Sequence, residues 1–218
     1  MNTQTAVLPS PDTIRQFPLF QSICAEKIYV IHHNAQCQSI ATALSQAPVL
    51  GFDTESKPTF VKGEVSTGPH LIQLATFDAA YLFQVNPETL SFLQPILANP
   101  DQIKVGFGLK NDVHLFRKKG IELSGIIDLA KSFGVFGIKT QMGVKNAVAL
   151  LFQQHFIKNK KVSTSNWAKK NLTQEQIQYA AADAYAPVII FKRFFELELF
   201  NPPLMKALSK AHASHPFF

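Results

Sequence analysis

Short apolar runs, bounded by polar or helix-breaking residues, recur along the first two thirds of the chain. They predict strands at 28–32, 49–54, 71–76, 80–85, 103–107 and 125–128. The stretches between and after them predict helices at 35–46, 88–98 and 110–119, with several more to about residue 199. The strands at 49–54, 71–76 and 80–85 follow one another without a predicted helix between them, and strands and helices then alternate. This order predicts an α/β fold, a mixed β-sheet flanked by helices on both faces.

Size and composition predict one main domain. At 218 residues and 46% hydrophobic content, the chain can bury a substantial core, which excludes a disordered protein. We expect the domain to occupy residues 27–200. Residues 1–26, which hold three prolines, read as an arm outside the main fold, and residues 201–218 read as a short C-terminal tail.

The sequence also indicates a compartment. No apolar run approaches the ~20 residues of a membrane span, and the N-terminus lacks the basic and apolar regions of a signal peptide. Cys24 and Cys37 are isolated, a pattern typical of reduced thiols. We therefore expect a cytoplasmic protein with no membrane partner, and we favour a monomer.

Candidate chemistry begins in the predicted strand at 49–54, which runs into Asp53 and Glu55. Side chains alternate between the faces of a strand, so both carboxylates share one face, about 7 Å apart. Two acids on one buried face repel each other unless a cation lies between them. The alternative is a strand end with solvated acids.

A third carboxylate, Asp112, follows the strand at 103–107 through a turn that contains Gly106 and Gly108. The run is not a dinucleotide-binding fingerprint, because Asn111 stands where the third glycine is required. Asp112 falls in the first turn of the next predicted helix. A helix dipole favours an acid there in the absence of any catalytic role, and that alternative stays open.

A late alanine-rich helix carries the last two candidates, Tyr179 and Asp183. Thr173 and Gln176 predict a capping box at its start. Residues four apart lie on one helical face, so Tyr179 and Asp183 point the same way. Taken alone, they also fit a core tyrosine and a surface aspartate. Pro187 lacks the N–H for the Asp183 carbonyl and predicts a bend or break there.

The ordered set of Asp-x-Glu on a strand, an aspartate after a later strand, and Tyr-x3-Asp on a late helix resembles the DEDD superfamily of 3′–5′ exonucleases. The tyrosine places the resemblance in the DEDDy branch. Three further segments are similar to the ribonuclease D and Werner-type exonuclease group: Leu71-Ile72-Gln73-Leu74, Ile127-Asp128-Leu129 and Ser165-Asn166-Trp167. The resemblance covers roughly residues 28 to 195 and implies a ribonuclease-H-like fold.

The resemblance also implies a catalytic site and its cofactors, two divalent cations, Mg²⁺ or Mn²⁺. Such hard cations prefer oxygen ligands, and a pair about 4 Å apart stabilises both the attacking and the leaving oxygen of a phosphodiester. By similarity, Asp53 would bridge both ions, and Glu55 and Asp183 would complete the ion that activates water. Asp112 would hold the ion at the leaving group, and Tyr179 would orient the attacking water.

The formal net charge of +6 fits a polyanionic partner. One group of lysines precedes the late helix: Lys158, Lys160, Lys161, Lys169 and Lys170. Lys160 matches a lysine that the family places ahead of its Asn-Trp or Asp-Trp pair, so we predict substrate binding by Lys160, Asn166 and Trp167. Ser163 stands where relatives carry an arginine. The alternative is a set of solvated lysines on a loop, with no role in substrate binding.

Two further features, Asp128 and the loop at 56–70, lie outside the main set of candidate residues. Asp128 resembles a fifth ligand, but its position after Ile126-Ile127 favours a strand end that caps the next helix. The loop at 56–70, rich in Lys, Gly, Ser and Thr, is expected to flank a substrate channel.

These features together predict a metal-dependent 3′–5′ exonuclease that releases nucleoside 5′-monophosphates from single-stranded or recessed 3′ ends, with DNA favoured. The alternatives are an exoribonuclease that trims RNA 3′ ends and a nucleic-acid-binding module with a silent catalytic centre. The complete set of acids argues against the silent module, since a pure binder of polyanions gains nothing from clustered carboxylates.

Overall fold

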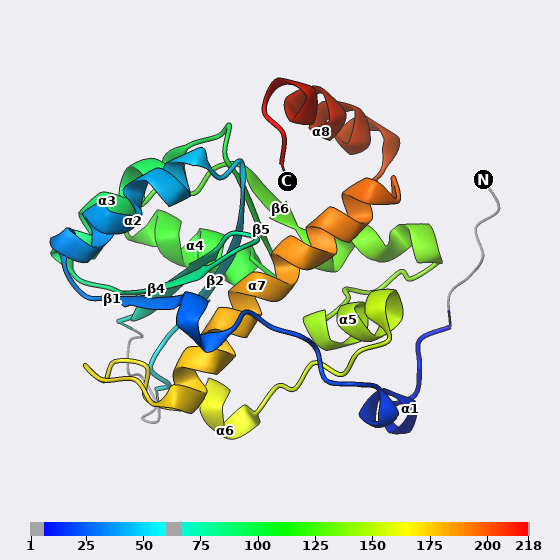
Figure 1. Ribbon diagram of the computed structural model, residues 1–218, viewed down its shortest axis with the longest axis horizontal. Coiled ribbons are helices and arrows are strands. Elements are labelled where there is room, and N and C mark those ends of the chain that lie inside the picture. Colours follow the sequence, from blue (N-terminus) through cyan, green and yellow to red (C-terminus); the bar gives the residue numbers. More distant parts are fainter. Residues whose placement is uncertain (1–6, 60–66, 218) are drawn as a thin grey trace.

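Six strands form one mixed sheet in the computed structural model, which describes residues 7–59 and 67–217 (Figure 1). Their order across the sheet is β1-β4-β3-β2-β5-β6. The pairs β2–β3 and β3–β4 are antiparallel and the other pairs are parallel. Each predicted strand is found to within one residue at either end: β1 (Ile28–Ile31), β2 (Val49–Glu55), β3 (Leu71–Ala75), β4 (Ala80–Gln84), β5 (Ile103–Gly106) and β6 (Ile126–Asp128).

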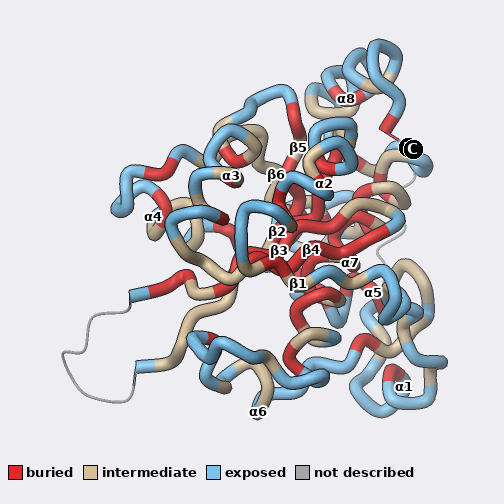
Figure 2. The backbone as a smooth tube through the Cα atoms, turned by 60° about the vertical axis from the view of Figure 1, so that its left-hand side comes forward, coloured by how far each residue is buried: buried red, intermediate tan, exposed pale blue. Residues whose placement is uncertain are grey.

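Helices cover both faces of this sheet, which confirms the predicted fold class. One face packs against α5 (Val144–Phe152) and α7 (Gln174–Glu196), and the other against α2 (Asn34–Gln46), α3 (Pro87–Ala98) and α4 (Lys110–Lys118). The alternation along β2 shows the division, because Val49 joins the α7 core while Leu50 and Phe52 join the opposite core. Figure 2 shows the strands as the buried centre of the molecule.

Both terminal segments contain more structure than the sequence predicts. The N-terminal segment holds α1 (Pro11–Gln16) and the 3₁₀ turn η1 (Ala25–Lys27), and the C-terminal tail forms α8 (Pro202–Ser214). The expectation that residues 1–26 lie outside the main fold is wrong for Phe20, whose ring packs 5.4 Å from that of buried Phe156. At the other end, Phe217 is buried against Phe191. Aromatic side chains therefore attach both segments to the main fold.

The sequence predicts a bend or break at Pro187, and a break is wrong, because α7 continues through this residue to Glu196 (Figure 1). Pro187 is buried together with Ala184 and Val188 where α7 crosses the sheet. Packing over this length outweighs the single lost backbone hydrogen bond. Neither α7 nor any other helix within the described ranges is long and apolar enough to cross a membrane.

The two remaining helical segments are η2 (Leu129–Phe136) after β6 and α6 (Lys160–Ser163) before α7. Of the loop expected to flank a substrate channel, residues 60–66 lie outside the described residues.

Candidate active site

Strand β2 directs Asp53 and Glu55 toward α7. They continue the face of Val49 and Gly51, whereas Leu50 and Phe52 enter the opposite core. Gly51 explains how close the helix comes, because a Cβ atom at this position would lie 1.8 Å from the carbonyl oxygen of Ala184. A glycine therefore allows the backbone of α7 to rest on the strand, and this contact brings Asp183 beside Asp53.

Helix α7 contributes the predicted Tyr179 and Asp183. The capping box at its start is confirmed, with Thr173 and Gln176 each accepting a hydrogen bond from the other's backbone N–H. Asp183 is only 4% exposed, and its Oδ1 has no hydrogen-bond partner among the described residues. Tyr179 is partly buried, with its ring 6.0 Å from that of Trp167. The helix thus presents an acid and a phenol toward β2.

Asp112 approaches the same end of β2 from α4. It lies in the first turn of that helix, as the sequence predicts. Thr54 Oγ1 donates a hydrogen bond to Asp112 Oδ1, so a side chain between Asp53 and Glu55 holds the third carboxylate in place. Burial raises the pKa of Asp112, although the hydrogen bond from Thr54 acts in the opposite direction. This contact joins β2 and α4 at the C-terminal end of β2.

The electrostatics are those of a crowded anionic site. Burial, and then the negative charge of Asp183, raise the pKa of Asp53 well above its ordinary value. Burial and the charge of Asp53 raise the pKa of Glu55 to about 9. Burial and the charge of Asp183 also raise the pKa of the Tyr179 hydroxyl. The pKa values of all three groups are raised because negative charges gather in a buried place with little compensating positive charge.

Among the described residues, the ammonium group of Lys158 enters this cluster. Its Nζ lies 3.0 Å from Asp183 Oδ2 and 5.7 Å from the centre of the Tyr179 ring. Burial acts to lower the pKa of Lys158, but the charges of Asp183 and Asp53 outweigh burial and raise it. The sequence places Lys158 in a basic cluster, but only the structure singles it out as the lysine that reaches the acids.

The donor set fits a hard divalent cation. Every candidate ligand is a carboxylate oxygen, one Asp183 oxygen is buried without a hydrogen bond, and an ammonium stands in as the compensating charge. Across residues 7–59 and 67–217, no three Asp, Glu, His or Cys side chains already form a group that could hold a metal ion. The donor set is that of a cation site, and in this structure the Lys158 ammonium supplies the positive charge.

Gln73 is a neighbour of the site that sequence reasoning missed as a functional candidate. It pairs in register with Asp53, and paired residues in an antiparallel ladder share a face of the sheet. The side chain is 0% exposed, and neither its Nε2 nor its Oε1 has a hydrogen-bond partner among the described residues. The signals in the sequence are a polar residue inside the apolar run 71–75 and the place of Gln73 in a segment that resembles the family. Gln73 thus offers a free donor and a free acceptor beside Asp53.

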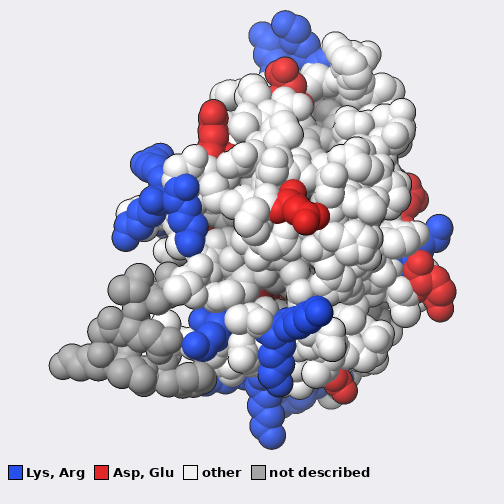
Figure 3. All heavy atoms as spheres, turned by 90° about the vertical axis from the view of Figure 1, so that its left-hand side faces the viewer, with Lys and Arg blue, Asp and Glu red and all other residues white. Residues whose placement is uncertain are grey.

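The three predicted substrate-binding residues lie just before α7. Lys160 is exposed at the start of α6, and exposed Asn166 accepts a hydrogen bond from the Ala168 N–H. Trp167 is 1% exposed and donates its indole N–H to the Ser163 carbonyl. Its ring packs beside that of Tyr179. Substrate binding by these residues stays a prediction. On the face in Figure 3, Lys and Arg side chains gather at the left edge and in the lower part.

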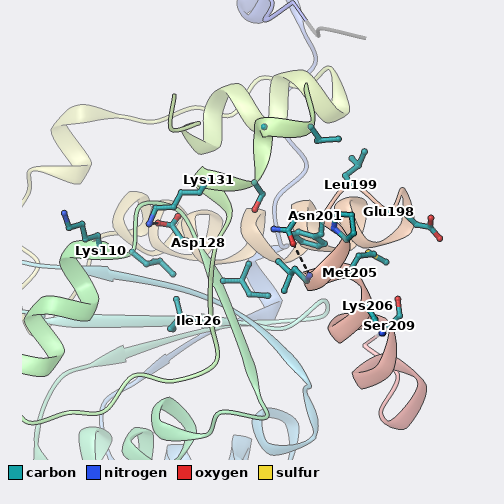
Figure 4. Close-up of a pocket in the computed structure, with 18 of the residues that line it drawn as sticks. Lys110, Ile126, Asp128, Lys131, Glu198, Leu199, Asn201, Met205, Lys206 and Ser209 are labelled. Atoms are coloured by element: carbon teal, nitrogen blue, oxygen red, sulfur yellow. Dashed lines mark hydrogen bonds and ion pairs between the residues drawn. The ribbon is translucent and has the colours of Figure 1, made fainter. Parts of the chain in front are cut away.

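Asp128 is a helix cap, as the strand-end interpretation predicts. Its Oδ1 accepts hydrogen bonds from the N–H groups of Ala130 and Gly108. It also lines a cavity of about 1140 Å³ between the β6–η2 segment and α8 (Figure 4). That cavity includes Lys110 from the start of α4 but none of the five predicted catalytic residues. The candidate chemistry therefore lies outside this cavity, at the C-terminal end of β2 beside α7.

Comparison with known proteins shows what the chain is similar to. A model of the family described as 3′–5′ exonuclease matches residues 28–197. The chain is 28% identical to the mouse bifunctional 3′–5′ exonuclease/ATP-dependent helicase WRN, over 82% of this chain and 13% of that protein. It is 31% identical to ribonuclease D of Granulibacter bethesdensis, over 66% of this chain and 36% of that protein. The chain thus spans well under two thirds of either relative.

A solved structure shows the same fold. The exonuclease domain of Aedes aegypti Nibbler superposes with a TM-score of 0.71 at 23% identity, covering 87% of this chain and 99% of that domain. The likeness extends over the sheet and its helices, in agreement with the predicted ribonuclease-H-like α/β fold.

Proposed function

Because the chain belongs to the 3′–5′ exonuclease family, we propose that it hydrolyses phosphodiester bonds at 3′ ends of nucleic acid and releases nucleoside 5′-monophosphates, with DNA favoured. The family makes the chain a hydrolase, and its members use divalent metal ions. One observation carries the proposal to particular residues. Asp53, Glu55, Asp112, Tyr179 and Asp183 come from β2, α4 and α7 and meet at one end of the sheet.

The four carboxylates are the residues that would hold two divalent cations, Mg²⁺ or Mn²⁺. When bound, such cations lower the pKa of water and stabilise the charge of the leaving oxygen. Asp53 projects from the strand between the acids of α4 and α7, so it is the residue best placed to be shared. Thr54 fixes one oxygen of Asp112, and the packing of Gly51 on Ala184 fixes the position of Asp183.

Tyr179 is the residue assigned to orient the attacking water. Its ring is held against Trp167, and its hydroxyl lies on the side of Asp183. Burial and the charge of Asp183 raise the pKa of this hydroxyl and favour its protonated form, which can donate and accept hydrogen bonds. Positioning of water is therefore its role in the proposal.

The preference for DNA is the finer part of the proposal, and RNA is the second candidate. The similarity to a protein named ribonuclease D favours RNA. Discrimination between the two depends on contacts to the 2′-hydroxyl group. Lys160 and Asn166 are exposed at the approach to α7 and are the residues proposed to contact substrate there.

The test uses 5′-labelled DNA and RNA oligonucleotides of one sequence, incubated with Mn²⁺, with Mg²⁺ and with EDTA. We expect a ladder that shortens from the 3′ end with either metal, faster on DNA, and no shortening in EDTA. A 3′-phosphorylated oligonucleotide distinguishes end-dependent from internal cleavage. Asp53→Asn protein, purified in the same way, controls for contaminating nuclease. Internal cleavage, or intact substrate with both metals, would contradict the proposal.

A further inference from the structure

The Lys158 ammonium occupies the position in the acid cluster where a positive charge is most needed. It forms an ion pair with Asp183, whose side chain is 2% exposed, and lies over the Tyr179 ring. Asp53 and Glu55 also interact electrostatically with this ammonium. One side chain therefore contacts or faces both acids of β2 and both functional residues of α7.

An ammonium and a divalent cation compete for such a place. Both are held by the same carboxylate oxygens, and a buried carboxylate without a cation is strongly unfavourable. The ammonium lies 3.0 Å from Asp183 Oδ2, so a metal ion bound to Asp183 would be close enough to Lys158 for strong charge repulsion. Metal binding at Asp183 is therefore disfavoured while the ammonium stays in this position.

The chain around Lys158 permits exchange. Phe156 is buried and anchors the backbone on one side, and Asn159 caps α6 through the Lys161 N–H on the other. The Lys158 side chain itself is 36% exposed along its length. Rotation about its side-chain bonds can thus carry the ammonium into solvent while α6 stays packed beside α7 (Figure 1).

We propose that Lys158 is the resident counter-ion of the active site, which holds Asp183 in the metal-free enzyme and competes with the divalent cation for that carboxylate. This inference rests on the proposed function and adds a residue to it. Lys158 stabilises the empty site and at the same time weakens metal binding. Binding of the metal releases the ammonium to the mouth of the site.

The first test compares Lys158→Met with Lys161→Met. Both substitutions remove one positive charge from neighbouring positions, but Lys161 is exposed in α6 and forms no described ion pair with the acids. Mn²⁺ affinity is measured by calorimetry without substrate. We expect Lys158→Met to bind Mn²⁺ about tenfold more tightly or better than wild type, and Lys161→Met to bind as wild type does.

The second test is thermal unfolding of the same proteins. In EDTA, the melting temperature of Lys158→Met should fall by about 4 °C or more, because Asp183 loses its only ion pair among the described residues. With saturating Mn²⁺ it should return to the wild-type value or exceed it. Lys161→Met should follow wild type under both conditions. A loss of stability that Mn²⁺ does not restore would mean that Lys158 is a permanent structural ion pair.

The ammonium can also be observed directly in wild type by NMR of its ¹³Cε and ¹⁵Nζ nuclei during titration with Mg²⁺. We expect the Lys158 signals to move with the midpoint of metal binding and the Lys161 signals to stay unchanged. Equal Mn²⁺ affinity of the two variants, with unmoved Lys158 signals, would overturn the inference while leaving the exonuclease assignment intact. If wild type binds no metal, binding by Lys158→Met supports the inference and its absence overturns both proposals.

Discussion

Two regions of the described structure hold a lysine ammonium against oxygen atoms, and they do so by different means. In β5, Lys104 is 0% exposed and donates hydrogen bonds to the carbonyl oxygens of Ile96 and Asn99 at the end of α3. These carbonyls carry only the partial negative charge of a helix C-terminus. Burial consequently lowers the pKa of Lys104 to about 8.

At the C-terminal end of β2, beside α7, the partners of Lys158 are full negative charges, and these raise its pKa although burial acts to lower it. This difference distinguishes a structural site, that of Lys104, from the candidate functional site around Lys158. Two carbonyl groups at fixed positions accept hydrogen bonds from one ammonium and hold it in place. A cluster of carboxylates accepts any cation of suitable size, so its occupant can be exchanged. We therefore expect changes at Lys104 to affect stability and changes at the carboxylates to affect catalysis.

The largest expected effect comes from removing one charge from the carboxylate region. Asp53→Asn should reduce hydrolysis by roughly 10³-fold or more, because the residue shared between the cations loses its charge. The melting temperature in EDTA should stay the same or rise, since repulsion from Asp183 is relieved. Single-turnover kinetics and thermal unfolding provide the two measurements. Asp101→Asn removes an exposed carboxylate elsewhere and serves as the control. Near-wild-type turnover of Asp53→Asn would remove the assignment.

Tyr179→Phe tests the same region without changing its charge. The ring and its packing against Trp167 remain, but the hydroxyl that positions water is lost. We expect the single-turnover rate to fall by roughly 10² to 10⁴, with Mn²⁺ affinity close to wild type. A wild-type rate would make Tyr179 a packing residue only. A rate lost together with Mn²⁺ binding would instead indicate damage to the metal site.

Lys104→Met tests the region where Lys104 donates to the carbonyls of Ile96 and Asn99. The quantity to follow is the pH dependence of the free energy of unfolding. Unfolded Lys104 keeps its proton up to about pH 10.5, whereas the folded protein releases it near pH 8. Between these values the unfolded state binds more protons, so the free energy of unfolding rises with pH. Relative to Lys104→Met, wild type should gain up to about 3 kcal/mol across this window.

Urea unfolding at several pH values between 8 and 10.5 measures this difference. Lys145→Met, at an exposed position of α5, should show no such trend. The exonuclease rate of Lys104→Met below its melting temperature should match wild type. A flat pH profile would mean that the Lys104 ammonium is not destabilised by its carbonyl cradle.

The smallest expected effect is at the border of the carboxylate region. Gln73→Leu should raise the free energy of unfolding by about 1 kcal/mol, because a buried amide without partners is removed. If this amide holds water on the cations, Mn²⁺ affinity should fall about tenfold. Gln102→Leu is the contrast, since buried Gln102 donates to the carbonyls of Leu44 and Ala47 and its loss should destabilise. Unchanged Mn²⁺ affinity in Gln73→Leu would place Gln73 outside the active site.

Local patterns in the sequence are sufficient to predict much of this protein. The strands follow from short apolar runs, and the shared face of Asp53 and Glu55 follows from the period of a strand. The start of α7 follows from the capping box of Thr173 and Gln176. These features depend on residues within a few positions of one another. Recognition of the family likewise needs only the order and spacing of the motifs.

Contacts between distant segments were decided by the tertiary structure alone. Pro187 reads as a helix break in isolation, yet α7 continues because its packing on the sheet outweighs one hydrogen bond. Gln73 becomes a neighbour of Asp53 only through the register of β3 on β2. Lys158 is one of five lysines in its cluster, and nothing local distinguishes it. Its ammonium reaches Asp183 because α6 and α7 pack side by side, so the site's own cation depends on the whole fold.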